Sequence, residues 1–147
     1  SQRLNEISEV EVKEAQEGDI LKNGAVYIAP GGKHMRVVKK GTDYCIKLSD
    51  EPAIDGLRPC ANVMYESLEN CQYDEITCVV LTGMGADGTK GIQGLAAHHK
   101  KLHAIAQDAD TCVVYGMPKA IAQTGLVDEV VPLGSVAETI TKNVGVS

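Results

Sequence analysis

Hydrophobic and polar positions in the first half of the chain follow the pattern of short β-strands. Residues 10–15 alternate apolar and charged side chains, as a half-buried strand does. Residues 25–29 form a short apolar run that ends at a Pro-Gly-Gly turn. Residues 34–38 and 44–48 flank a polar loop with one glycine, which predicts a β-hairpin. A helix is predicted at 61–70.

The second half changes to a regular alternation of strand and helix patterns. Residues 76–81 (ITCVVL) form a continuous β-branched run, which is typical of a strand buried on both faces. The elements predicted after it are helix 88–101, strand 102–106, helix 118–123, strand 127–133 and helix 135–143. This order predicts an α/β fold: a mainly parallel, doubly wound sheet with helices on both faces and a β-hairpin in the first half. Ligands of such sheets bind at the carboxyl ends of the strands.

Composition narrows the possible function classes. The chain has 147 residues and a net charge of -6, without a basic patch, which argues against nucleic-acid binding. Its apolar runs are much shorter than the ~20 residues that span a bilayer, and its first residues lack the apolar core of a signal peptide. The five Cys form no C-x-x-C pair, which favours reduced, buried thiols in the cytoplasm over a disulfide or zinc framework.

One glycine-rich loop carries the strongest indication of chemistry. Residues 81–91 (LTGMGADGTKG) leave a predicted buried strand and enter a predicted helix. One interpretation is dinucleotide binding, because Gly83-x-Gly85-x-x-Gly88 fits the fingerprint and Asp108 follows Gly88 by 20 residues. The carboxylate of Asp87 argues against it, since the pyrophosphate needs positive potential in the loop.

Two further interpretations concern Asp87 itself. A carboxylate on a glycine-rich loop after a parallel strand suits the acid of a Ser-His-Asp triad, where it holds the histidine tautomer. The same side chain is equally suited to cap the helix that begins near Gly88. The residues alone leave both interpretations open.

Motifs spread over almost the whole chain resemble the catalytic domain of the bacterial chemotaxis protein-glutamate methylesterase. The loop LTGMGADG at 81–88 is similar to the signature of that family. The segment AVYIAPGGKHM at 25–35 resembles its strand, turn and His-Met segment, and residues 57–59 resemble its Arg-Pro motif. AQD at 106–108 and CVVYGMP at 112–118 resemble a further stretch, and all of these motifs follow the family's order.

The resemblance implies hydrolysis of glutamate methyl esters, and deamidation of glutamines, on the cytoplasmic region of transmembrane chemoreceptors. It implies that Asp87 is the catalytic acid and that Met84 and Gly85 support the active site, with His34 on the substrate side. It implies no cofactor, no metal and no membrane insertion. A receiver domain accompanies the catalytic domain in full-length members of the family.

Two of the three triad residues of that family have no counterpart here. Its serine lies in a Gly-x-Ser-Thr-Gly-Gly turn and its histidine in a His-Met-Pro-like segment, and neither motif occurs. Residues 3–5 resemble the end of the helix that follows the triad histidine. We therefore expect residues 1–147 to be the C-terminal part of a single catalytic domain, without a receiver domain. Such a chain supplies only the Asp and is inactive alone; a non-catalytic fragment is the other possibility.

The remaining candidate residues favour ordinary surface roles. His98, His99 and His103 have no carboxylate or cysteine at ligand spacing, so a solvated surface is favoured over a metal site. The basic residues of the predicted hairpin are interpreted as solvated, with acidic receptor helices as a conceivable partner. These residues are Lys33, Arg36, Lys39 and Lys40.

Overall fold

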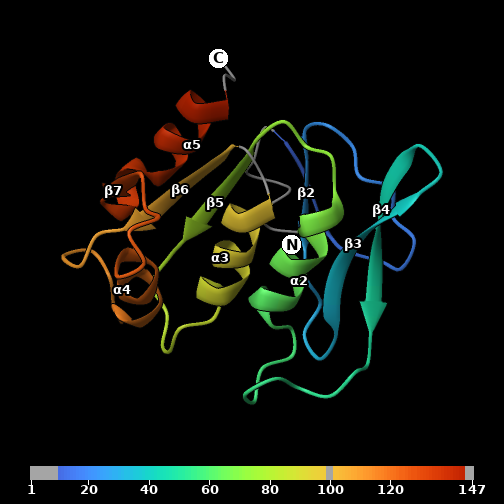
Figure 1. The fold of residues 1–147 in the computed structure, drawn as a ribbon, viewed down its shortest axis with the longest axis horizontal. Coiled ribbons are helices and arrows are strands. Elements are labelled where there is room, and N and C mark those ends of the chain that lie inside the picture. Colours follow the sequence, from blue (N-terminus) through green and yellow to red (C-terminus); the bar gives the residue numbers. More distant parts are fainter. Residues whose placement is uncertain (1–9, 99–100, 145–147) are drawn as a thin grey trace. The chain divides into compact units, whose positions relative to one another are not determined.

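The computed structural model describes residues 10–98 and 101–144, so the predictions for residues 3–5 and for His99 lie outside the described residues. The contacts of the chain cluster into two units, which meet in sequence between Cys71 and Gln72. Figure 1 shows the elements of both units, and each unit is described by itself below.

The first unit begins with two parallel strands. β1 (Glu11–Glu14) pairs with β2 (Ala25–Ile28), with Glu11 opposite Ala25. Val12 is buried, whereas Glu11 and Glu14 at the two ends of β1 are exposed. Both strands were predicted from the sequence, and both are confirmed with slightly shorter ends.

A β-hairpin follows in the same unit. β3 (His34–Lys40) pairs antiparallel with β4 (Asp43–Ser49), with Lys40 opposite Asp43. The predicted hairpin is confirmed, but its strands run further than the pattern indicated. Gly41 has a φ of 65° in the two-residue turn, and this left-handed conformation lets the strand pairing continue to the tip.

A short helix covers the hairpin. α2 (Ala61–Ser67) continues into the 3-10 helix η1 (Leu68–Asn70), which together confirm the predicted helix at 61–70. Val63 is 4% exposed, and α2 contacts β3. The hydroxyl of Ser67 accepts a hydrogen bond of 2.9 Å from the Val37 backbone N–H, which fixes the end of the helix to the strand.

Three parallel strands form the sheet of the second unit. Their bounds are β5 (Ile76–Val80), β6 (Leu102–Gln107) and β7 (Glu129–Val131), in the spatial order β5-β6-β7. Val80 lies opposite Ala106, and Gln107 lies opposite Val131. β7 is shorter than the predicted strand 127–133 at both ends, and at its C-terminal end Pro132 has no N–H to continue the ladder.

Helices connect and cover these strands. Their bounds are α3 (Thr89–His98), α4 (Gly116–Ala122), the 3-10 helix η2 (Leu133–Ser135) and α5 (Val136–Val144). Ile92, Leu95 and Ile121 are completely buried, and Ile105 is 1% exposed, so the core of this unit is aliphatic. α4 begins two residues before the predicted start at Pro118. The alternation of parallel strands and helices confirms the predicted α/β organisation.

The cysteines are free thiols in both units. Cys45, Cys60, Cys71 and Cys78 are buried as predicted, whereas Cys112 is partly exposed. Burial raises the pKa of the Cys78 thiol to about 12, so this group stays protonated at neutral pH. Across residues 10–98 and 101–144, no helix is both long enough and apolar enough to cross a bilayer.

Candidate active site

The glycine-rich loop lies where the sequence predicted it, between the carboxyl end of β5 and the start of α3. Gly85 and Gly88 have φ values of 83° and 96°, which side chains with a Cβ rarely adopt. The Thr89 N–H donates to the Ala86 carbonyl over 3.2 Å and closes the last turn of the loop. The backbone can therefore reverse direction between β5 and the helix within a few residues.

A second loop, from the end of β6 to α4, is hydrogen-bonded to the first. The Thr82 hydroxyl donates to the Val114 carbonyl over 3.0 Å and accepts from the Val114 N–H over 2.9 Å. The Gly83 N–H donates to the same carbonyl over 3.0 Å, and the Gly83 carbonyl accepts from the Met117 N–H over 2.8 Å. A parallel β-bridge joins Gly83 to Tyr115. The two loops are therefore held together along their backbones.

Close packing at the same place explains two of the glycines. A Cβ on Gly83 would lie 2.5 Å from the Met117 Sδ. A Cβ on Gly116 would lie 2.8 Å from the Gly83 carbonyl oxygen and 2.9 Å from the Gly85 nitrogen. Gly116 faces backbone atoms, which cannot rotate away as a side chain can, so this contact requires glycine.

A buried amide side chain lies beneath the two loops. Gln107, the last residue of β6, is completely buried. Its Oε1 accepts a hydrogen bond of 2.8 Å from the Thr82 N–H. Its Nε2 donates to the carbonyl and the hydroxyl oxygen of Thr111 over 2.9 and 3.2 Å. One side chain thus joins the segment after β5 to the segment after β6.

Thr111 extends these bonds to the end of β7. Its hydroxyl donates to Asp108 Oδ1 over 2.6 Å and accepts from the Leu133 N–H over 3.0 Å. We call Thr82, Gly83, Gln107, Thr111, Val114 and Met117 the strand-end network. This network connects the carboxyl ends of all three strands of the second unit, the edge at which parallel sheets bind ligands.

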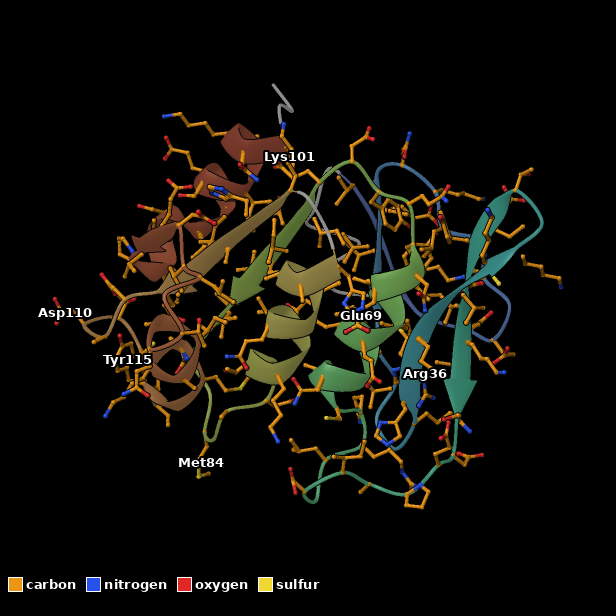
Figure 2. The ribbon with its side chains drawn as sticks, in the orientation of Figure 1. Arg36, Glu69, Met84, Lys101, Asp110 and Tyr115 are labelled. Carbon is orange, nitrogen blue, oxygen red and sulfur yellow. The ribbon has the colours of Figure 1, made fainter. Side chains whose placement is uncertain are left out.

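The predicted site residues of the second unit all lie on the loop after β5. Met84 is 83% exposed, and Figure 2 shows its side chain extending outward from the turn. Gly85 occupies the left-handed position, and Asp87 is partly buried two residues before α3. The structure therefore places Met84, Gly85 and Asp87 together on one loop that the strand-end network fixes.

His34 belongs to the first unit, whereas Asp87 belongs to the second. The side chain is 1% exposed, and its Nε2 lies 3.0 Å from the Pro52 carbonyl oxygen. A carbonyl oxygen only accepts, so Nε2 carries a proton. The Nδ1 atom is buried and has no hydrogen-bond partner among the residues that the structure describes.

The other described histidines are engaged differently. His98 is exposed, with its Nδ1 2.8 Å from the Gly94 carbonyl oxygen. His103 Nε2 lies 2.7 Å from Glu129 Oε2, and its Nδ1 lies 3.8 Å from Asp128 Oδ2. No carboxylate lies at ligand spacing from His103 in the sequence. The pairing of β6 with β7 brings Asp128 and Glu129 close to it. Within the described ranges, no group of three His, Cys, Asp or Glu side chains is arranged to hold a metal ion.

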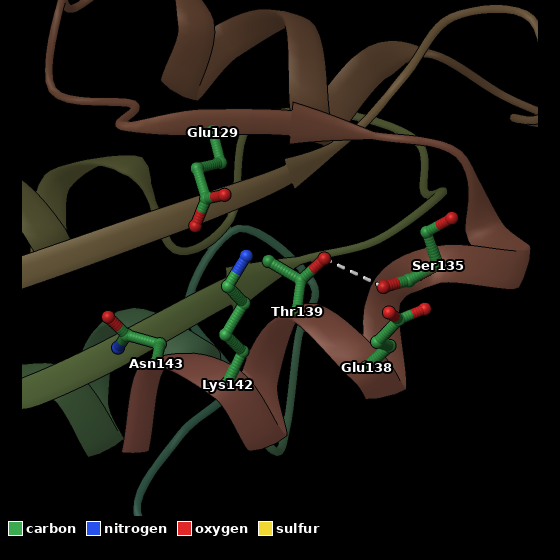
Figure 3. A pocket seen from close by; sticks show the side chains of 6 residues that line it. All are labelled: Glu129, Ser135, Glu138, Thr139, Lys142 and Asn143. Carbon is green, nitrogen blue, oxygen red and sulfur yellow. Dashed lines mark hydrogen bonds between the residues drawn. The ribbon is translucent and has the colours of Figure 1, made fainter. Parts of the chain in front are cut away.

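A polar hollow lies beside His103, away from the glycine-rich loop in sequence. Its volume is about 470 Å³, and every side chain that lines it is polar or charged (Figure 3). The lining residues are Glu129, Ser135, Glu138, Thr139, Lys142 and Asn143. Asn143 donates to Thr77 Oγ1 over 2.6 Å, which ties α5 to β5. This hollow has no apolar wall of the kind that usually lines a small-molecule site.

Comparison with known proteins places the fold and the loop in a family. The family model described as CheB methylesterase matches residues 1–140. The chain belongs to the CheB methylesterase family. The crystal structure of the Thermotoga maritima CheB methylesterase catalytic domain resembles it with a TM-score of 0.89 and 35% identity, over 96% of this chain and 74% of that one. This likeness confirms the predicted α/β fold class and the predicted family.

Curated relatives in the CheB methylesterase family are similar along nearly the whole chain. The relative from Desulfotalea psychrophila is 43% identical over 143 residues, which are 96% of this chain and 39% of the relative. The relative from Oceanobacillus iheyensis is 45% identical over 141 residues, 95% of this chain and 40% of the relative. Both are named protein-glutamate methylesterase/protein-glutamine glutaminase. The chain thus spans about two fifths of the length of these relatives.

Sequence reasoning found the loop but missed the residues that hold it. In the sequence, Gln107 and Thr82 lie within family-like motifs, and Thr111 lies in none of them. One indication was present: Gln107 is a polar residue directly after the apolar run at the end of a predicted strand. Buried polar residues are usually hydrogen-bonded, so this position was a candidate for a structural bond.

Proposed function

We propose that the chain is part of an enzyme that hydrolyses glutamate methyl esters, and deamidates glutamines, on the cytoplasmic region of chemoreceptors. The names of the relatives and the family membership support this reaction class. The observation that carries the proposal is the position of Asp87 on a rigidly bonded loop at the carboxyl end of β5. We further propose a cytoplasmic location, which the four buried free thiols support.

Asp87 is the acid of a Ser-His-Asp triad in this proposal. Its carboxylate accepts a hydrogen bond from the catalytic imidazole, fixes the tautomer and stabilises the imidazolium that forms during the reaction. The bonds between Thr82, Gly83 and the second loop support this role. They hold the loop backbone in one place, and a positioned carboxylate costs little reorganisation during the reaction.

The reaction proceeds through an acyl-enzyme. The serine Oγ attacks the ester carbonyl carbon, its proton passes to the histidine, and the leaving methoxide takes that proton and departs as methanol. A water molecule then attacks the acyl-enzyme, which releases the glutamate carboxylate and restores the serine. The N–H groups of Thr82 and Gly83 are already bonded, so we assign oxyanion stabilisation to the next amides, at Met84 and Gly85.

The serines of the described residues support a nucleophile from outside this sequence. Ser67 donates to the Met64 carbonyl over 2.6 Å, and Ser49 donates to Glu51 Oε1 over 2.9 Å. Neither is bonded to a histidine, and Ser135 lies in η2 without a Gly-x-Ser-x-Gly turn. We propose that the serine and the catalytic histidine belong to further parts of the enzyme. The family membership alone supports the further proposal that His34 acts on the substrate side.

The decisive experiment compares Asp87→Asn with Asp110→Asn in the complete enzyme that contains this chain. Asp110 is an exposed carboxylate on the loop after β6, so its replacement is a matched control. We expect Asp87→Asn to lower kcat for methanol release from methylated receptor by about 10⁴-fold, as for other triad acids. If Asp87 only caps α3, kcat and stability both stay nearly unchanged, because Asn caps a helix about as well as Asp does. That result would refute the assignment.

A second experiment tests how much of the chemistry this chain carries. We expect the 147-residue chain alone to release no methanol from methylated receptor. Addition of the segments that supply the serine and histidine should restore turnover. Turnover by the chain alone would show that the nucleophile is among its own residues and would refute this part of the proposal.

Two observations disfavour the alternative of dinucleotide binding. The Thr82 and Gly83 amides donate to Gln107 and Val114, so they are not directed at a phosphate. Asp108 accepts hydrogen bonds from the N–H and hydroxyl of Thr111, so its Oδ1 is already engaged. A rise in melting temperature of the chain on addition of NAD would reverse this conclusion.

A further inference from the structure

We propose that Gln107 is a positioning residue that sets the place of the Met84–Asp87 loop. This inference rests on the proposed function, because it concerns the same loop and its catalytic carboxylate. Gln107 touches neither the substrate nor the reacting atoms in this proposal. It acts through Thr82, the second residue after β5.

The position of Gln107 in the sheet makes this role possible. Val80 pairs with Ala106, so the side chain of the next residue on β6 reaches the segment that follows β5. The Gln107 Oε1 holds the Thr82 N–H at 2.8 Å, and the Thr82 hydroxyl in turn bonds both backbone groups of Val114. Gly83, the next residue, is bonded on both sides to the second loop. Only four residues separate Thr82 from Asp87, so a displacement of Thr82 also displaces the carboxylate.

Only an amide satisfies all the partners at this buried point. Oε1 must accept from the Thr82 N–H while Nε2 donates to the Thr111 carbonyl and hydroxyl. Leucine at this position would leave a buried donor and a buried acceptor without partners. A carboxylate would present an acceptor to the Thr111 carbonyl oxygen, which itself only accepts. A protonated carboxyl group, in contrast, keeps one acceptor and one donor in nearly the same shape.

This difference between the two states of a carboxyl group provides the test. In the complete enzyme, we expect Gln107→Glu to lower kcat by about 10²-fold at neutral pH, the effect of a displacement of about 1 Å. KM should change little, because the side chain lies beneath the loop. As pH falls and the carboxyl group protonates, the ratio of variant to wild-type kcat should rise toward one. Gln107→Leu should show the same loss without the recovery.

Controls separate positioning from general stability. Gln123→Glu, at an exposed position after α4, should give a kcat ratio close to one that does not change with pH. All kcat values are referred to the number of active sites titrated with a serine-directed acylating reagent, so unfolded enzyme does not count. An unchanged kcat per titrated site in both Gln107 variants, with only a lower melting temperature, would overturn the proposal.

Amide hydrogen exchange on the 147-residue chain tests the positioning role without measuring turnover. Gln107→Leu should accelerate exchange at the Thr82, Gly83 and Met117 amides, while the amides of the β3–β4 hairpin keep their rates. Unchanged exchange at Gly83 and Met117 would refute the positioning role even if Asp87 is catalytic. Accelerated exchange, together with an unchanged kcat in Asp87→Asn, would instead support the positioning of the loop and refute the proposed triad.

Discussion

The charged hairpin, defined as residues 33–51 with β3 and β4, and the strand-end network use polar groups in opposite ways. In the hairpin, Lys33 pairs with Asp50 and Arg36 pairs with Glu51, each over 2.7 Å, at the solvent-exposed surface. In the network, Gln107 is completely buried, and both its oxygen and its nitrogen are bonded. Water can replace a lost partner at the surface but not in the interior, so the network is the more sensitive to substitution.

The largest expected effect comes from crowding the strand-end network. A methyl group in Gly116→Ala would meet the Gly83 carbonyl oxygen at 2.8 Å, so the two loops must separate. We expect a loss of about 1–3 kcal/mol in the free energy of unfolding, measured by urea denaturation. Gly134→Ala is the matched control, because a Cβ there meets no atom within 4 Å. Equal stability of the two variants would contradict the close packing.

The next largest effect is expected from acid, which should destabilise the first unit by protonating Asp19. The Gln16 N–H at 2.9 Å and the Lys13 ammonium at 3.0 Å hold the pKa of Asp19 below its ordinary value of 3.8. Stability from this carboxylate is therefore present above pH 3.8 and is lost as the pH falls through the lower, folded pKa.

Amide exchange against pH tests this sign. Protection of the Gln16 amide should fall in acid, and Asp19→Asn should weaken that protection already at neutral pH and flatten its dependence on pH. Gln107 and Thr82 do not titrate, so the Thr82 amide provides an internal reference in the same sample. An identical pH profile in Asp19→Asn would show that this carboxylate is not the cause.

The smallest effect is expected in the charged hairpin itself. Lys33→Met removes the exposed pair with Asp50, and exposed pairs of this kind contribute little to stability. The melting temperature should change far less than in Gly116→Ala, and added salt should shrink the difference further. Lys39→Met is the control, since Lys39 forms no ion pair with any described residue. A loss as large as that of Gly116→Ala would remove the contrast between the two regions.

Local patterns were sufficient to predict most elements, and tertiary contacts explain the exceptions. The continuous apolar run at 76–81 predicted β5 because both faces of that strand are largely covered. α4, in contrast, begins at Gly116, and the Met117 N–H finds its acceptor in the Gly83 carbonyl. Pro118 needs no acceptor in the first helical turn, so it fits inside the helix and does not mark its start.

The sequence by itself determined the family, the order of the elements and the loop that carries Asp87. These features depend on neighbours in the chain: apolar periodicity, glycines that permit left-handed turns, and motifs with fixed spacing. It also placed Met84 and Gly85 on the same loop as that carboxylate.

Only the tertiary structure decided which side chains hold that loop. Gln107 and Thr82 are 25 residues apart and meet because the β5–β6 register brings them together. His103 and Glu129 are 26 residues apart and meet across β6 and β7. Strand register follows from burial of whole faces of the sheet, and no local pattern of residues specifies it. The residues that give the loop its chemistry can therefore be identified from the sequence, whereas the position of the loop depends on the folded sheet.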